Sequence, residues 1–231
     1  MNIILIGAQG AGKGTQAQNL AHTLGVVHVS SGDLLRTVSN SDTDIGQQVK
    51  AHLDRGELVP DSLTVALVLK RITEPDAKRS GFLLDGFPRT ITQAQTLDQG
   101  LTELGPEIDC AVYLSVPREV LLQRLSGRYI CRAHQHVYNS VTQPPKVEGI
   151  CDIDGSPLYQ RSDDRGPAIE KRLDIFFRET FQLLDYYSSQ ARLVEVDGND
   201  SIEQVRKNLF HAIAEFELKK KHQDDNHPDN P

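Results

Sequence analysis

The chain has 231 residues, of which 38% are hydrophobic and 25% are charged, and its formal net charge is −7. This length accommodates one sizeable core with a small inserted domain, and the composition is that of a globular protein. The acidic balance argues against a nucleic-acid-binding protein, whose footprint is a basic face. No apolar run approaches the roughly 20 residues that span a bilayer, and no signal-peptide pattern begins the chain, so we expect a cytoplasmic protein without a membrane partner.

Short apolar runs alternate along the chain with amphipathic stretches, which indicates strands alternating with helices. The predicted strands are Met1–Ile6, Val26–Ser30, Gly81–Asp85, Cys110–Val116 and Leu193–Val196. The predicted helices are Thr15–Leu24, a stretch that begins at Ser31–Asp33, Ile45–Leu53, Asp61–Ile72, Pro117–Arg128 and most of Gly166–Gln190. This alternation is typical of a parallel sheet with helices on both faces, so we expect a three-layer α/β fold.

Two stretches break this alternation. Residues 129–164 are rich in Pro, Gly, Tyr and short polar alternations, which indicates a small inserted β-rich domain. The last residues, 219–231, combine Lys, His, Asp, Asn and Pro. Such a composition cannot bury a core, and we expect a tail without ordered structure.

A glycine-rich loop lies between the first predicted strand and the first predicted helix. Its sequence from Gly7 to Thr15 is Gly-Ala-Gln-Gly-Ala-Gly-Lys-Gly-Thr. Glycines here let backbone N–H groups turn towards phosphate oxygens, and the helix N-terminus favours an anion. The expected phosphate site consists of Gly10, Ala11, Gly12, Lys13, Gly14 and Thr15. Gly14 stands where the strict motif has Ser or Thr, which weakens the case for direct Mg²⁺ ligation by the loop.

Further stretches place charged and hydroxyl side chains where a second phosphate compound could bind. Ser30–Arg36 puts hydroxyl groups and a predicted helix start near an arginine, and Asp85 ends an apolar strand four residues before Arg89. The carboxyl ends of parallel strands are where open α/β sheets bind ligands. More arginines follow, at Arg124, Arg128, Arg161 and Arg172.

Together these stretches resemble the adenylate kinase family. The matching sequences are GAQGAGKGT, SSGDLLR, GFLLDGFPRT, PPKVEG and QRSDD, in this order from residue 7 to about residue 172. The resemblance implies a P-loop NTPase-like core at 1–29, 61–123 and 165–218, a helical AMP-binding insertion at 30–60 and a β-rich lid at 124–164. It also implies reversible, Mg²⁺-dependent phosphoryl transfer from ATP to AMP that gives two ADP, and we expect a monomer.

The same resemblance implies a role for each matching residue. It places ATP against the loop residues 10–15 and against Arg124, Arg128, Tyr138 and Gly198. It places AMP against Ser31, Arg36, Leu58, Val59, Gly86, Arg89, Gln93, Arg161 and Arg172, with Gln93 on the adenine edge. The side chains implied in catalysis are Lys13, Asp85, Arg89, Arg124, Arg161 and Arg172, of which Asp85 orders the waters of Mg²⁺. Asp163 and Asp164 are implied in lid closure, and Tyr138 has an alternative role in packing inside the lid.

The inserted domain carries a possible zinc site. Cys131 and His134 form a C-x2-H pair, and after sixteen intervening residues Cys151 and Asp154 form a C-x2-D pair. Two such pairs are the pattern of a structural zinc site, which would staple an insertion too small for a core of its own. The alternative is a network of hydrogen bonds among the same four residues, and His136 is a competing ligand.

Two rival functions remain open at this point. One is a P-loop kinase for another nucleoside monophosphate, such as UMP, CMP or GMP, because base selection depends on few contacts. The other is a non-catalytic nucleotide-binding switch whose insertion binds a partner. The clustering of arginines favours phosphoryl transfer, since a planar guanidinium matches two phosphate oxygens and stays charged when dehydrated.

Overall fold

A central sheet of five parallel strands organises the computed structural model, which describes residues 1–105, 107–161 and 164–225. The strands are β1 (Asn2–Ile6), β2 (Val27–Ser30), β3 (Phe82–Asp85), β4 (Cys110–Ser115) and β8 (Leu193–Asp197), and their order is β2-β3-β1-β4-β8. All four pairings are parallel. The predicted α/β fold with a central parallel sheet is therefore confirmed.

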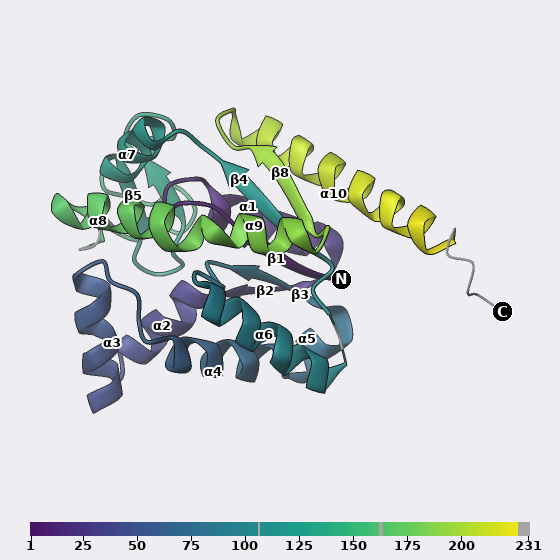
Figure 1. Cartoon of the computed structure of the whole chain (residues 1–231). Helices are drawn as coiled ribbons and strands as arrows, with labels where there is room; N and C mark the ends of the chain where they lie inside the picture. The colour runs from purple at the N-terminus through teal and green to yellow at the C-terminus, as the bar shows by residue number, and fades with distance from the viewer. Residues whose placement is uncertain (106, 162–163, 226–231) are drawn as a thin grey trace.

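Helices cover both faces of this sheet (Figure 1). Helix α1 (Lys13–Leu24) packs against β1, β2, β3 and α10 (Ile202–Asp225), whereas α9 (Gln182–Ser189) packs against β8 and α6 (Ile91–Leu104). Because neither face meets water, all five residues of β1 are buried. The strands therefore end together at one edge, and the connections that follow their carboxyl ends converge there.

Three helices in the structure were not predicted from the sequence: α5 (Pro75–Ser80), α6 and α10. Among the α10 side chains that the structure describes, Val205, Leu209 and Ile213 form a narrow buried stripe, with Phe210, Ala212 and Phe216 partly buried beside it. It extends to Asp225, so residues 219–225, which we expected to lack structure, are helical. Residues 226–231 lie outside the described part of the chain.

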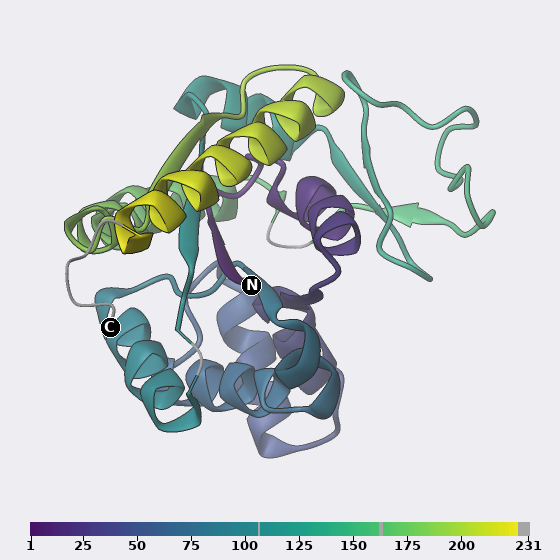
Figure 2. The ribbon, with the colours of Figure 1, turned by 90° about the vertical axis from the view of Figure 1, so that its right-hand side faces the viewer.

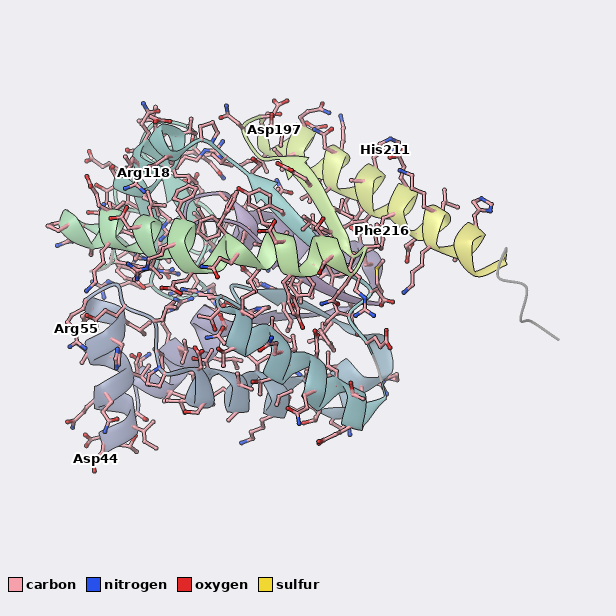
Figure 3. The ribbon with its side chains drawn as sticks, in the orientation of Figure 1. Asp44, Arg55, Arg118, Asp197, His211 and Phe216 are labelled. Atoms are coloured by element: carbon pink, nitrogen blue, oxygen red, sulfur yellow. The ribbon has the colours of Figure 1, made fainter. Side chains whose placement is uncertain are left out.

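Two helices and the loop after them form a helical insertion, residues 31–60, on one side of the core. Helix α2 (Ser31–Ser39) and helix α3 (Asp44–Asp54) begin after Ser30 and Thr43, whose hydroxyl groups accept hydrogen bonds from the Asp33 and Gly46 amides. Leu35, Val49 and Val59 make a small core against helix α4 (Asp61–Ile72). Figure 3 labels Asp44 at the outer tip of α3 and Arg55 just beyond its other end.

The β-rich insertion, predicted as a lid at 124–164 and called the lid below, includes the end of helix α7 (Arg118–Ser126) and lies on the other side. Strands β5 (Arg128–Cys131), β6 (Val137–Asn139) and β7 (Leu158–Tyr159) form an antiparallel sheet in the order β6-β5-β7. Figure 2 shows this sheet projecting from the side of the molecule, clear of the helical insertion.

The last part of the core is a helical segment that changes pitch. We predicted one long helix, but α8 (Pro167–Ile175) is followed by a π-helix, η2 (Phe176–Thr180), and then by α9. A π-turn inserts an extra residue into a helix and is often found at functional sites. Among the described helices, none has the length and apolarity needed to cross a membrane.

Candidate active site

The phosphate loop leaves β1 at the carboxyl edge of the sheet and leads into α1. Gly10 and Gly12 adopt left-handed φ values of 85° and 93°, which strongly favour glycine. A Cβ at Gly10 would also lie 3.0 Å from Leu125 Cγ. Gly12 caps α1 without a side chain, so the first amides of the helix are directed to the cleft rather than to a capping group.

Lys13 folds back over this loop. Its ammonium donates hydrogen bonds to the carbonyl oxygens of Gly7 (2.7 Å) and Ala8 (3.0 Å). Burial lowers the pKa of Lys13 to about 8; Asp85 opposes this shift, and nearby arginines reinforce it. A phosphate group that binds beside Lys13 would stabilise the charged ammonium form and so raise this pKa again.

Asp85 stands at the end of β3, beside the loop. Burial favours its neutral form, but the nearby His28 imidazole and the charge of Lys13 hold the pKa of Asp85 below the ordinary value. The atoms His28 Nε2 and Asp85 Oδ2 are 3.5 Å apart. Asp85 and Thr15 both line the cleft, and an ionised carboxylate there fits the oxygen ligands and ordered waters that Mg²⁺ prefers.

A cleft of about 670 Å³ opens above the phosphate loop, within the size range of nucleotide-sized ligand sites. Every residue predicted to contact ATP lines it: Gly10, Ala11, Gly12, Lys13, Gly14, Thr15, Arg124, Arg128, Tyr138 and Gly198. Asp85, Gly86 and Arg161 line the same cleft. A chain with an acidic net charge thus concentrates cationic side chains at this one place.

A second, smaller pocket lies between the helical insertion and the sheet. Its lining includes Ser31, Arg36, Leu58, Val59, Arg89, Gln93 and Arg172, all predicted to contact AMP. The three arginines in this lining, Arg36, Arg89 and Arg172, also line the large cleft. The two pockets therefore meet at a group of guanidinium side chains.

The turn around Arg89 is held on every side. Its amide donates to Gln93 Oε1 (2.8 Å), and its carbonyl oxygen accepts from the Thr180 hydroxyl group of the π-helix (2.9 Å). The Arg89 Nε donates to the Gly86 carbonyl oxygen (2.8 Å), which also accepts from the Ser31 hydroxyl group (2.7 Å). These bonds fix the direction in which the guanidinium points before any ligand binds.

Other arginines of the cleft have partners in the protein. Arg124 donates to the Gly198 carbonyl oxygen at 3.1 Å, and Arg161 donates to Gln135 Oε1 at 3.3 Å. Arg36 pairs with Asp33, one turn earlier on α2. A phosphate group would have to replace or share these contacts.

Asp164 is buried between the lid and the core. Its carboxylate accepts from Arg128 Nε (2.7 Å) on β5 and from Arg172 NH1 (2.8 Å) on α8. Burial favours the neutral form, but the charges of Arg128 and Arg172 hold the pKa of Asp164 below its usual value. The predicted partner in lid closure, Asp163, lies outside the described residues.

The inserted domain brings together two thiols, an imidazole and a carboxylate. One ligand atom each from Cys131, His136, Cys151 and Asp154 lies within 4.8 Å of the others. The Sγ of Cys131 is 3.1 Å from Asp154 Oδ2, and Nδ1 of His136 is 3.3 Å from Cys151 Sγ. Ligand atoms around a tetrahedral zinc are roughly 3.3–3.8 Å apart, so the cluster is compatible with a structural zinc ion.

The imidazole in this cluster differs from the one that we predicted. The backbone reverses at Gln135 (φ 60°), and the Cys131 amide donates to the His136 carbonyl oxygen at 2.8 Å. This turn returns His136 to the side of Cys131. His134 instead contacts Asp154 from the solvent side, with Nδ1 2.8 Å from Oδ2 and 67% of its side chain exposed.

Tyr138 lies beneath this cluster. Its hydroxyl group accepts from the Asp152 amide at 2.7 Å and lies 3.4 Å from Cys151 Sγ. The side chain is buried and its ring borders the large cleft. The hydroxyl group is thus used inside the lid, as in the alternative role for this residue.

Besides Gln9, sequence reasoning missed four side chains that contact residues of the site: His28, Asp61, Gln135 and Thr180. They act through contacts with residues far away in the chain, such as the bond between Thr180 and Arg89, 91 positions apart. Gln9 lines both pockets from within the phosphate loop and was the one residue with a local signal, its place in the motif.

Comparison with known proteins gives a consistent result. Residues 5–192 match the family model described as adenylate kinase. An adenylate kinase of Staphylococcus epidermidis is 47% identical over 213 residues, which cover 92% of this chain and 99% of that protein. An adenylate kinase of Staphylococcus aureus strain Mu50 is similar to the same extent over the same shares of the two chains.

Proposed function

We propose that this chain, which belongs to the adenylate kinase family, reversibly transfers the γ-phosphoryl group of ATP to AMP and so forms two ADP. The observation that carries this proposal is the meeting of the two pockets at Arg36, Arg89 and Arg172. A triphosphate on the phosphate loop and a monophosphate in the smaller pocket would direct their phosphates to the same guanidinium groups. That geometry suits direct transfer between two bound nucleotides.

Catalysis in this proposal consists of alignment and charge stabilisation. Lys13 and the first amides of α1 bind the phosphates of ATP, while Arg36 and Arg89 hold the phosphate of AMP. This acceptor phosphate is already an anionic nucleophile, so the reaction needs no general base. The transition state spreads negative charge over three equatorial oxygens, which planar guanidinium groups match in pairs.

Mg²⁺, when bound with ATP, neutralises charge on the β- and γ-phosphates. Asp85 would hold it through ordered waters, and the presence of Asp85 and Thr15 in the lining of the same cleft supports that proposal. The lowered pKa of Asp85 keeps the carboxylate ionised for this task.

The lid would complete the site when both substrates are bound. Arg124 lies near the end of α7, and Arg128 opens the first lid strand, so movement of this body would place both over the transferring group together with Arg161. Closure would exclude water, which otherwise competes with AMP for the phosphoryl group. Asp164, between Arg128 and Arg172, would help to hold the lid to the core.

A zinc ion held by Cys131, Cys151, Asp154 and one imidazole would act as a structural staple in the lid. In the same proposal the enzyme works as a monomer in the cytoplasm. None of the three cysteines forms a disulfide bond, which supports a reducing compartment.

The test is formation of ADP by the purified protein from ATP with AMP, UMP, CMP or GMP, each with Mg²⁺ and with excess EDTA. We expect rapid, Mg²⁺-dependent formation of ADP with AMP and far slower reaction with the other three. Preference for another monophosphate would overturn the choice of AMP. No transfer to any of the four would overturn the enzymatic function.

A further inference from the structure

Asp61, the first residue of α4, holds two side chains from another element. Its Oδ2 accepts from the Thr90 hydroxyl group at 2.9 Å, and its Oδ1 accepts from Gln93 Nε2 at 2.7 Å. Thr90 caps α6, and Gln93 lies in the first turn of that helix. Asp61 itself is not among the residues that line the smaller pocket. It can therefore influence a ligand there only through the side chains that it holds.

Gln93 is the side chain through which Asp61 reaches the pocket. It lines the smaller pocket, although only 2% of its surface is exposed. The two ends of a carboxamide have almost the same shape, so packing alone does not decide which end is nitrogen. The partners must decide it.

Each hydrogen-bond partner of the Gln93 carboxamide can play a single role, either donor or acceptor. The Asp61 carboxylate can only accept a hydrogen bond, and the Arg89 amide, 2.8 Å from Gln93 Oε1, can only donate one. Turning the carboxamide by 180° would set its oxygen against the carboxylate and its nitrogen against the amide. Both bonds would be lost, and like polar groups would face each other in a buried place.

This lock leaves the carboxamide with one N–H and one oxygen lone pair for a ligand. The adenine edge presents the N6 amino group as a donor beside the N1 acceptor. A 6-oxopurine presents the reverse order, an O6 acceptor beside the N1–H donor. A carboxamide that could turn freely would suit either base, whereas a locked one suits a single order of donor and acceptor.

We propose that Asp61 is a specificity-determining positioning residue, which locks the Gln93 carboxamide so that the pocket accepts a 6-aminopurine monophosphate and rejects a 6-oxopurine monophosphate. This inference rests on the proposed function, because it assumes that the smaller pocket holds the nucleobase of the phosphate acceptor. Sites built to hydrogen-bond one pattern reject the reversed pattern, since their buried polar groups are then left unpaired.

The experiment compares AMP, a 6-aminopurine nucleotide, with IMP, a 6-oxopurine nucleotide. Each serves as the phosphoryl acceptor at a saturating concentration of ATP. The variants are Asp61→Ala and Asp61→Asn, and the quantity is the ratio of kcat/KM for AMP to kcat/KM for IMP. We expect Asp61→Ala to lower this ratio roughly tenfold, the usual scale for one buried hydrogen bond that decides orientation. Asp61→Asn keeps an oxygen that can accept from Gln93 but can also turn its own nitrogen towards it, so it should lower the ratio less than Asp61→Ala does.

Asp44→Ala is the matched control, because Asp44 is the first residue of α3 as Asp61 is of α4, and it is exposed at the tip of the insertion (Figure 3). It removes the same charge from the same helical position and should leave the ratio unchanged. If Asp61→Ala does not fold, Asp61→Ser keeps a polar side chain at the start of α4 but is too short to hold the carboxamide, and it should show the same loss of selectivity.

A purely structural role for Asp61 would lower kcat/KM for AMP and for IMP by the same factor. An unchanged ratio in folded Asp61→Ala or Asp61→Ser, in an enzyme that still phosphorylates AMP, would overturn the inference and leave the proposed function intact. Failure of the wild-type protein to phosphorylate AMP would overturn both.

Discussion

The helical insertion and the lid flank the same cleft but are stabilised in different ways. The insertion encloses three aliphatic side chains, Leu35, Val49 and Val59, and its two helices have hydroxyl caps. The lid encloses Cys131, Tyr138 and Cys151, each of which carries a polar atom. A body of about 35 residues cannot bury enough apolar surface to stabilise itself. The lid therefore depends on its polar cluster, and the insertion on apolar packing against α4.

This contrast means that the two bodies can be perturbed separately. Hydrophobic burial responds to the volume of side chains, whereas a cluster of thiols, imidazole and carboxylate responds to chelators and protons. The smaller pocket is lined by residues of the first kind of body, and the large cleft by residues of the second.

The largest expected effect comes from the guanidinium group where the two pockets meet. Arg89→Ala should lower kcat/KM for AMP by about 10³-fold or more, because it removes a preorganised charge from the transferring phosphate. Thermal unfolding should change little. Arg118→Ala is the control: Arg118 pairs with Asp174 on the outside of the core and should retain near-normal kcat/KM. Near-normal turnover by Arg89→Ala would remove this residue from the mechanism.

Removal of zinc should unfold the lid and leave the helical insertion folded. After treatment of zinc-loaded protein with a strong chelator, we expect amides of β5 and β6 to lose protection from hydrogen exchange, because the cluster replaces a core there. Amides of α2 and α3 should keep their protection. Equal loss in both bodies would contradict the contrast, and unchanged lid protection would leave the cluster a hydrogen-bonded network.

Two variants can decide whether His136 or His134 supplies the imidazole ligand of the zinc ion. His136→Ala should weaken zinc binding by more than about 100-fold, since it removes a ligand, whereas His134→Ala should weaken it by about tenfold or less as a partner of Asp154. Competition with a chromogenic chelator measures both affinities. The reverse ranking would return the ligand role to His134, the residue that the C-x2-H spacing predicts.

Apolar packing in the insertion gives a smaller effect. Val49→Ala should destabilise the insertion by about 2 kcal/mol, through lost burial and the cavity that remains. Exchange of the α2 and α3 amides should accelerate accordingly, while the lid amides stay as they are. Ile45→Ala on the same helix is the control, because Ile45 is 53% exposed. A similar response of the two variants would show that packing at Val49 is not what stabilises this body.

The smallest effect concerns the π-helix. Thr180→Val deletes the hydroxyl group that binds the Arg89 carbonyl oxygen, and loss of one such bond should raise KM for AMP several-fold. KM for ATP should not change. Thr180→Ser keeps the hydroxyl group and should restore the wild-type KM, whereas equal changes in both KM values would indicate a general loss of stability.

Parts of the molecule could be predicted because their signals are local. The phosphate loop is one continuous stretch from Gly7 to Thr15, and the buried strands are continuous apolar runs. Helix α6 escaped prediction because its apolar pattern is interrupted by Gly100, and only the fold shows that Leu69 lies where a Cβ would be. Helix α10 escaped because its buried stripe is narrow.

The site shows the same division between local and distant signals. Residues in motifs, such as Lys13 and Arg89, line the pockets that the motifs imply. The side chains that hold them do not belong to any motif: Asp61 reaches Gln93 across 32 positions. The choice between His134 and His136 depends on one left-handed residue, Gln135, whose conformation the residue pattern does not indicate. Spacing predicts the chemistry of a cluster but not the path of the backbone through it.

The Asp164 carboxylate acts as a built-in counter-ion. Because it already neutralises charge on Arg128 and Arg172, these arginines do not depend on small anions from solution in the substrate-free protein. A nucleotide that binds in the cleft would share these guanidinium groups with the Asp164 carboxylate and would release few dissolved anions from them. Rising ionic strength should therefore weaken substrate binding less steeply than the number of arginines in the cleft suggests.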